Sequence, residues 1–380
     1  MIFWSACVGI LFFGMAITTL GSIVPDLKNK FGLSDISIGA LFTILPFGIL
    51  AGSLFFGPIS DRFGYRILLS IACISMFLGF EGIAFSSSLS VLNICIFLFG
   101  LGGGAINGAT SALIADISPE NKGANLSFLG VFFGLGALTM PFILGFLQYR
   151  FSYQIIVSIV GFATLGVGIF YLLLHFPAPK QSAGFLVKEG LLLIKNRNLL
   201  LIAFFLFFQS AFEGIINNWV PTFLTTSKNV SQQYALYALS VSVVGMVVMR
   251  LLLGSIFRGL KAKNIWLISF ASLFLGLIFL GFGEIYVLLC CGLFLIGAGL
   301  AAGFPIMLGY VGNRFKELSG TAFSIAFVIA LSGNMIINYT MGIIAQRVGI
   351  QHLITVGFVQ LFIMIILTGL ILRGEKFAAV

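Results

Sequence analysis

Long apolar runs, separated by short charged or turn-rich segments, dominate the pattern of the chain. Each run reaches about 20 residues, the length that an α-helix needs to cross the hydrocarbon core of a bilayer. The runs are continuous rather than alternating, which excludes the strands of an outer-membrane barrel. Twelve membrane-spanning helices are therefore expected, at about residues 3–24, 36–58, 66–86, 90–114, 126–148, 153–175, 199–224, 234–257, 264–283, 285–311, 319–344 and 351–372.

The composition excludes several classes of protein. Of 380 residues 60% are hydrophobic and only 8% are charged, whereas an ordinary soluble protein has about 25% charged residues. A soluble enzyme, a secreted disulfide scaffold and a nucleic-acid-binding domain are thus excluded, and the expected surroundings are a lipid bilayer. The net charge of +9 comes from residues between the apolar runs, which is typical of membrane anchoring. The five cysteines lie inside apolar runs without metal-ligand spacing, so we expect free thiols and no metal site.

The basic residues predict an orientation. With both termini in the cytoplasm, fourteen Lys and Arg residues lie inside, five lie outside, and only Arg250 falls within an expected span. Such a bias is the positive-inside pattern. The first apolar run lacks a basic start and is interpreted as a first span, not as a cleavable signal peptide. We expect an integral, multi-pass protein of a bacterial inner (plasma) membrane.

The longest connection, residues 176–198, divides the spans into an N-terminal bundle (1–175) and a C-terminal bundle (199–380). It contains two prolines, four basic residues and the apolar stretch 191–194. This stretch is either a short helix on the membrane surface or part of an unstructured loop.

The two halves repeat each other. A shift of 197 residues aligns eight identical residues in order, seven of them glycines: 48 with 245, 57 with 254, 100 with 297, 102 with 299, 123 with 320, 127 with 324, 136 with 333 and 145 with 342. Parallel six-helix halves are a transporter architecture. The expected fold class is an all-α polytopic membrane protein with twelve transmembrane helices in two pseudo-symmetric six-helix bundles.

A charged loop joins the second and third spans. Its sequence, GPISDRFGYR from residue 57 to 66, resembles the signature loop of the major facilitator superfamily, although Tyr65 replaces a basic residue. The matching residues, to which the resemblance assigns a role in conformational gating, are Gly57, Asp61, Arg62, Gly64 and Arg66. The resemblance covers the whole chain. It implies a monomeric carrier, not an enzyme, that works by alternating access with no cofactor beyond a coupling ion, H⁺ or Na⁺.

Two further residues are gating candidates. Asp116 ends the fourth span before a loop, SPENKG, of the kind that similar proteins have there. Arg250 is expected near the end of the eighth span. It either partners Asp116 or a helix C-terminus, or its side chain extends to the membrane interface.

Polar side chains inside the spans are costly and are therefore functional candidates. The seventh span carries the densest set, and the fourth, eleventh and first spans add others. The substrate-binding candidates are Gln209, Asn217, Asn218, Trp219, Asn107, Asn334, Asn338 and Thr18. Amides and an aromatic face suit a polyhydroxylated neutral solute, and the absence of Lys or Arg at mid-membrane argues against a strongly anionic one. The alternative for each amide is a hydrogen bond between helices.

Glu213 lies near the middle of the seventh span and shares one helix face with residues 209 and 217. A carboxyl removed from water favours its neutral form, so Glu213 is a candidate for proton coupling. It could also bind sodium or a sugar hydroxyl. The structural alternative is a neutral Glu that ties two helices together.

The segment EGIINNWVPTFL, residues 213–224, resembles the seventh helix of the fucose–glucose/galactose permease branch. The resemblance implies a small neutral polar solute, a monosaccharide, carried with a proton or sodium. Fucose permeases carry acids in helices 1 and 4. This chain has none in its expected first span and has Gly103 at the position in the fourth, so Glu213 would act alone.

Two other functions remain open. One is proton-coupled export of drugs, amphipathic compounds or lipids. Drug/proton antiporters have a Gly-Pro pair and then a glycine pair in the fifth helix, where this chain has Met140, Pro141 and the single Gly145. The other is a receptor on the same fold that binds a solute without transporting it.

Overall fold

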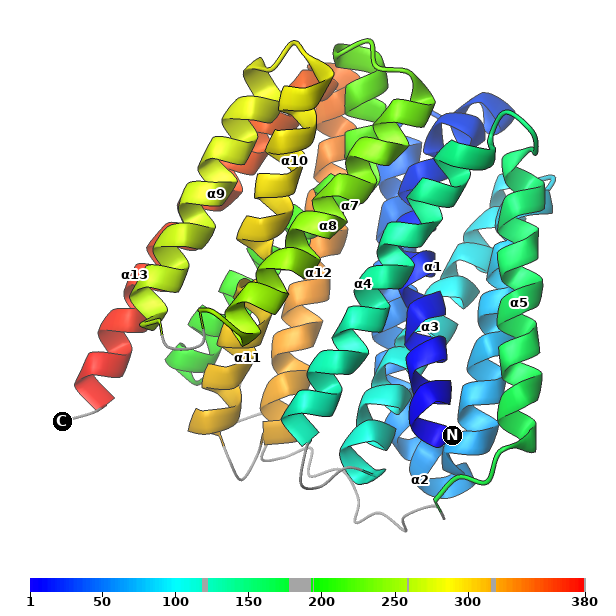
Figure 1. The fold of residues 1–380 in the computed structure, drawn as a ribbon, viewed down its shortest axis with the longest axis horizontal. Coiled ribbons are helices and arrows are strands. Elements are labelled where there is room, and N and C mark those ends of the chain that lie inside the picture. Colours follow the sequence, from blue (N-terminus) through cyan, green and yellow to red (C-terminus); the bar gives the residue numbers. More distant parts are fainter. Residues whose placement is uncertain (118–121, 178–192, 194, 258–259, 316–318, 379–380) are drawn as a thin grey trace. The chain divides into compact units, whose positions relative to one another are not determined.

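The structure, a computed structural model, describes residues 1–117, 122–177, 193, 195–257, 260–315 and 319–378, with the backbone alone at 57, 58, 61, 115, 122–124, 127, 319–321 and 374–378. The described chain is mainly helical (Figure 1). The elements are α1 (Ile2–Phe31), α2 (Asp35–Phe85), α3 (Leu89–Ile117), α4 (Lys122–Leu147), α5 (Tyr153–Leu173), α7 (Arg197–Ser227), α8 (Gln232–Gly254), α9 (Ala262–Phe282), α10 (Tyr286–Leu300), α11 (Gly303–Arg314), α12 (Ser319–Arg347), η2 (Ile350–His352) and α13 (Leu353–Ala378).

The expected number of spans is confirmed. Within the part of the chain that the structure describes, twelve segments are long and apolar enough to cross a membrane. The element α2 contains two of them, Asp35–Phe56 and Arg62–Phe85. Its backbone leaves the helical conformation at Gly64 (φ 78°, ψ 165°), and this left-handed φ favours glycine. The span Tyr286–Arg314 consists of two helices, α10 and α11.

Large apolar side chains cover much of the surface of these helices. The exposed ones include Phe47, Phe55, Phe142, Phe146, Phe162, Phe282 and Phe362. A water-soluble monomer rarely exposes apolar patches of this extent. The hydrocarbon of a bilayer fits such a surface, and helices satisfy their backbone polar groups internally there. The chain is therefore an integral, multi-pass membrane protein.

The chain forms two compact units. The first consists of Met1–Ala183 with Gln232–Ser240, and the second of Gly184–Ser231 with Val241–Val380. In the first unit α2 packs along α3 and α5, and α1 packs along α4. In the second unit α7 packs along α12 and α13, and α9 packs along α10. Most of the predicted linker, residues 178–192 and 194, lies outside the described residues, and so does the surface helix considered there.

The repeated glycines make equivalent contacts in the two units. A Cβ added at Gly48 of α2 would collide with the carbonyl oxygen of Phe97, and one added at Gly245 of α8 would collide with that of Phe294. The two glycines are 197 residues apart, and so are the two phenylalanines, which is the offset of the sequence repeat. Small residues at these points let the helix backbones touch.

A second pair of contacts follows the same rule. A Cβ at Gly100 of α3 would collide with the carbonyl oxygen of Leu45, and one at Gly297 of α10 would collide with that of Ser242. The second span therefore packs on the fourth as the eighth packs on the tenth. These contacts show the pseudo-symmetry expected from the sequence at the level of single atoms.

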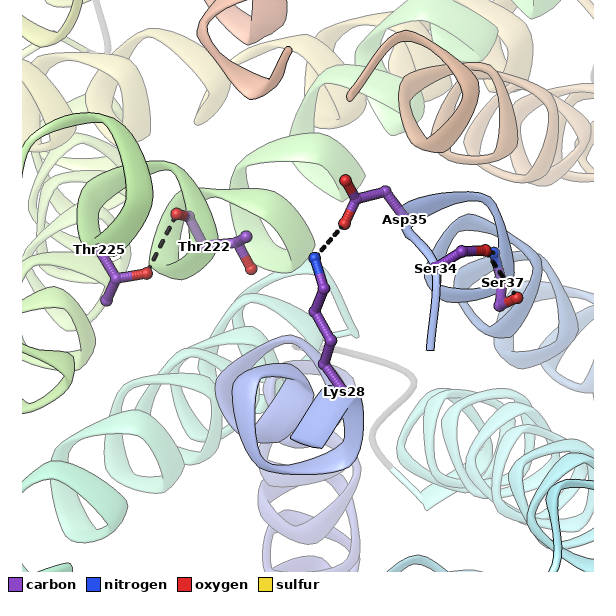
Figure 2. Close-up of polar contacts among 6 residues, drawn as sticks. All are labelled: Lys28, Ser34, Asp35, Ser37, Thr222 and Thr225. Atoms are coloured by element: carbon purple, nitrogen blue, oxygen red, sulfur yellow. Dashed lines mark hydrogen bonds and ion pairs between the residues drawn. The ribbon is translucent and has the colours of Figure 1, made fainter. Parts of the chain in front are cut away.

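Polar contacts define several helix ends (Figure 2). The connection between α1 and α2 is short, and the Lys28 ammonium binds the Asp35 carboxylate across it. Ser34 caps α2, because its hydroxyl accepts a hydrogen bond from the Ser37 backbone N–H at 3.2 Å. In α7 the Thr225 hydroxyl donates to the Thr222 carbonyl oxygen at 3.1 Å.

Candidate functional site

A series of amide hydrogen bonds ties α7 to α12 in the second unit. The Asn218 Nδ2 donates to the Asn338 Oδ1 at 3.1 Å, and the Asn338 Nδ2 donates to the Asn334 Oδ1 at 3.0 Å. The Asn334 Nδ2 in turn donates to the Ser210 carbonyl oxygen at 3.0 Å. Each amide thus forms at least one hydrogen bond, either to another helix or within its own helix. In this region an unpaired polar group would be costly.

Gly214 makes room for this series of bonds. A Cβ at this position would lie 2.6 Å from the Nδ2 atoms of both Asn334 and Asn338. Residues 210, 214 and 218 share one face of α7 because they are four residues apart. This face meets α12, so Asn218 and its neighbour Asn217 point in different directions.

Gln209 contacts a break in the tenth span. The helix α10 ends at Leu300 and α11 begins at Gly303, and Pro305 cannot donate a backbone hydrogen bond to the preceding turn. The Gln209 Nε2 donates to the Leu300 carbonyl oxygen at 2.8 Å. A side chain at Gly303 would collide with the Gln209 amide. The two residues between the helices, Ala301 and Ala302, keep helical backbone angles, so the break is a local interruption of hydrogen bonding within one span.

Replacing Gln209 by Leu should destabilise this break. The Leu300 carbonyl would lose its buried side-chain donor, at an expected cost of about 1–3 kcal/mol. The apparent melting temperature in detergent should therefore fall. The matched control is Gln351→Leu, because the Gln351 Nε2 also donates to a carbonyl, that of Val348 at 3.0 Å, but on an exposed surface. Equal melting temperatures for the two variants would contradict a supporting role for Gln209.

Glu213 lies one residue before Gly214, and its side chain is half-buried. Its electrostatic partner is Arg250 of α8. The two side chains form no direct ion pair, and neither makes a hydrogen bond to another group among the residues that the structure describes. Glu213 therefore has a charged neighbour, which the sequence pattern does not indicate.

Arg250 is oriented by the direction of its helix. From the sequence alone its partner could be Asp116 or a helix C-terminus, or its side chain could extend to the membrane interface. Arg250 lies one turn before the end of α8 at Gly254, and helical side chains tilt toward the helix N-terminus. Its side chain is thus expected to extend away from the end of α8, and its charge acts on Glu213 of α7 without a direct ion pair. Arg250 lies near the end of its span, as expected, and the absence of Lys or Arg from the middle of the membrane stays a prediction.

The remaining candidates of the second unit differ in burial. Asn217 and Asn334 are half-buried, whereas Gln209, Asn218, Trp219 and Asn338 have almost no exposed surface. The buried amides make the hydrogen bonds that are the structural alternative to substrate contact. A role for any of them in substrate binding stays a prediction.

The first unit holds the other two candidates. Asn107 of α3 is half-buried. Thr18 of α1 is fully buried, and its hydroxyl donates to the Met15 carbonyl oxygen at 3.3 Å within its own helix. Substrate contact by either residue stays a prediction.

Asp26 is an acidic residue of the first helix that lies outside the expected span. That span ends at residue 24, but α1 continues through Pro25 to Phe31 and includes Asp26. The prediction that the first helix lacks an acid is therefore wrong. The Gln232 Nε2 of α8 donates to the Asp26 Oδ2 at 2.9 Å within the first unit. The spacing of Ile23, Leu27 and Phe31, four residues apart, is the signal for this longer helix.

The signature loop is partly described. The Arg62 guanidinium lies over the Phe63 ring, 5.3 Å from its centroid, and Arg66 is exposed. The Asp61 side chain and the surroundings of Gly57 lie outside what the structure describes. Tyr65, which replaces a basic residue, donates its hydroxyl to the Asp116 Oδ2 at 2.8 Å. This bond joins the loop to the end of α3.

Comparisons with known proteins agree with this architecture. The family model described as Major Facilitator Superfamily matches residues 6–338. The glucose/mannose transporter GlcP of Bacillus subtilis is 24% identical over 345 residues, which cover 87% of this chain and 84% of the relative. A D-xylose–proton symporter structure superposes with a TM-score of 0.77 at 16% identity over 96% of both chains. A mutant of the nucleoside transporter NupG superposes with a TM-score of 0.79 at 17% identity over 98% of both chains.

Proposed function

Because the chain belongs to the Major Facilitator Superfamily, we propose that it is a secondary transporter that carries a small polyhydroxylated solute of monosaccharide size in symport with a proton. The observation that supports the coupling is Glu213, a half-buried carboxyl inside a membrane span without a hydrogen bond to any residue that the structure describes. Intramembrane carboxyls of this kind mark proton pathways in transporters. The proposed cycle is alternating access.

The amides beside Glu213 support the proposed class of solute. Asn217 and Asn334 keep accessible surface, and an amide offers both donors and acceptors to hydroxyl groups. Among the similar proteins, GlcP is named as a glucose/mannose transporter, and one solved structure is named as a D-xylose–proton symporter.

Arg250 favours the proton over sodium as the coupling ion. A sodium ion beside Glu213 would be repelled by the guanidinium through a medium of low polarity. A proton on the Glu213 carboxyl removes its charge and adds none. We further propose that both termini lie in the cytoplasm, on the basis of the basic residues. A monomer in a bacterial inner membrane is proposed from the family resemblance.

Replacing Tyr65 by Phe should change gating without changing substrate affinity. The bond from Tyr65 to Asp116 joins two helix ends, and loss of one hydrogen bond is worth about 1 kcal/mol. This energy corresponds to about fivefold in an equilibrium between conformations. We expect the maximal transport rate to change by up to this factor at unchanged half-saturation. Tyr149→Phe, at an exposed position, is the control. A Tyr65→Phe rate equal to that of the control would show that the bond has no part in gating.

A panel of solutes tests the proposed function. Purified protein in proteoliposomes would face labelled D-glucose, D-xylose, D-gluconate and D-glucuronate, each with and without an inward proton gradient and with and without sodium. The proposal expects proton-driven accumulation of at least one of them. No uptake of any solute of the panel, together with efflux of an amphipathic dye, would favour the alternative, an exporter of drugs, amphipathic compounds or lipids. Binding of a sugar without flux would indicate a receptor.

A further inference from the structure

We propose that Arg250 binds a carboxylate of the transported solute, so that the cargo is a sugar acid or a similar hydroxylated monocarboxylate. The inference rests on the proposed function and names the substrate class of the same site. The second unit has an unusual feature, the guanidinium of Arg250 within a membrane span without a direct partner among the described residues. The Nε of Arg250 is buried and makes no hydrogen bond to any of them.

The surroundings of Arg250 are mainly apolar. Its neighbour Met249 is buried in an apolar cluster with Ala298 and Ala301, next to the break in the tenth span, and partly buried hydrophobic side chains pack on this cluster. The cluster offers no carboxylate. A charged group in such a place is costly unless it is paired, so the geometry favours a ligand that supplies an anion.

Glu213 is the charged side chain that acts on Arg250 in the described part of the second unit. The elements packed on α7 carry their charges at their ends: Arg314 ends α11, Arg347 ends α12, His352 lies in η2, and Arg373 lies near the end of α13. The helix α10, which contacts α8 at Gly245, carries no charged residue. Arg250 and Glu213 tilt toward each other because α7 and α8 are consecutive spans of opposite direction. The helix α9, whose Ile268 packs on the cluster around Met249, carries Lys263 in its first turn and Lys261 at its N-cap. The carboxylate that acts on Arg250 among the described residues is thus that of Glu213.

Charge balance then selects the cargo. In the proposed cycle an ionised Glu213 compensates the charge of Arg250 in the empty carrier from a distance, without a direct ion pair. When Glu213 takes up a proton to carry it, Arg250 loses this compensation, and a neutral sugar would leave the cation unpaired. A solute carboxylate restores the balance, and the guanidinium can bind its two oxygens side by side. The loaded and the empty sites then have the same net charge, and both avoid an unpaired ion in a medium of low polarity.

Two consequences follow. The solute carboxylate and the Glu213 carboxylate compete for Arg250, so proton uptake and anion binding favour each other. One monovalent anion also moves with one proton, and the transport cycle is electroneutral. The driving force is therefore the proton gradient alone, not the membrane potential.

The test separates the two driving forces in proteoliposomes. Purified full-length protein would face labelled D-gluconate, D-glucuronate, D-glucose and D-xylose, first with a proton gradient and the potential clamped to zero, and then with a potential and no proton gradient. We expect accumulation of a sugar acid in the first condition only, with uptake of the neutral sugars weaker by about tenfold or more. Arg250→Gln should reduce uptake of the acid by about tenfold or more, and Arg250→Lys should raise the half-saturation concentration several-fold.

The controls keep the inference distinguishable from the proposed function. Arg347→Gln removes an exposed arginine at the end of α12 and should behave as the wild type, and monodisperse elution shows that each variant is folded. If Arg250→Gln does not fold, two other measurements test the inference. They are the half-saturation concentration of Arg250→Lys and the comparison of proton gradient and membrane potential as driving forces for the wild type. Uptake of neutral sugars driven by the potential, with no uptake of acids, would overturn the carboxylate inference and leave the proposed function standing. A folded wild type that carries neither class would overturn both.

Discussion

Glu213→Gln should abolish uphill accumulation while solute exchange continues. A glutamine cannot take up or release a proton, but it resembles the protonated carboxyl in shape and neutrality. The loaded carrier can therefore still reorient and exchange solute. One pH unit stores about 1.36 kcal/mol per proton and supports about a tenfold gradient of cargo. In the variant we expect the ratio of internal to external cargo concentration to fall to about one.

The matched control is a second intramembrane glutamate. Glu81 of α2 accepts hydrogen bonds from the Ser158 hydroxyl at 2.9 and 3.0 Å, which ties it to α5, and a glutamine there can still accept one such bond. Glu81→Gln should therefore keep its accumulation ratio. Labelled-solute accumulation and counterflow, measured on the same liposomes, separate the two activities. An accumulating Glu213→Gln variant would exclude Glu213 as the coupling group.

Alanine at Gly297 should destabilise the second unit, and alanine at its repeat partner Gly100 should destabilise the first. In each case the new Cβ would meet a backbone oxygen, that of Ser242 or Leu45. Backbone atoms of a packed helix cannot move aside as a flexible side chain can. Overpacking of this kind typically costs about 1–3 kcal/mol, so both variants should melt at clearly lower temperature and give less monodisperse protein.

Gly369→Ala is the matched control, because nothing lies within 4 Å of a Cβ at that position of α13. An alanine there should leave the melting temperature unchanged or slightly raised, since glycine costs about 1 kcal/mol relative to alanine within a helix. Thermal unfolding in detergent compares the three variants. If only one of Gly100→Ala and Gly297→Ala were destabilising, the two units would not share the packing that their repeat predicts.

The spans and the repeat could be predicted from the sequence because both depend on local signals. An apolar run of about 20 residues has few structural alternatives, and residues at close helix contacts must be small in both halves. The offset of 197 residues therefore reappears in the contacts of Gly48 and Gly245. The signature loop could be located in the same way, from the spacing of its glycines and charges.

The partners of the polar residues could not be predicted from the sequence. Periodicity places Gln209, Glu213 and Asn217 on one face but does not say which helix each one meets. Gln209 meets the break after Leu300, and Asn218 meets Asn338. Such contacts depend on how helices pack, which involves residues far apart in the sequence.

Two differences from expectation have signals in the sequence. Pro25 suggests the end of the first span, but the apolar spacing resumes after it, and α1 continues to Phe31. The distance of Arg250 from the end of its helix leaves its partner open. In the structure the charge that acts on Arg250 is that of Glu213, a residue of a different helix, which the spacing along one helix does not indicate.

Solute-dependent proton movement across proteoliposomes tests the central claim most directly. The external medium should become alkaline when the cargo is added to wild-type liposomes. Liposomes with the Glu213→Gln variant should give no such signal while they still exchange labelled cargo. Cargo flux in the wild type without any proton movement, or equal alkalinisation by the variant, would contradict proton coupling through Glu213.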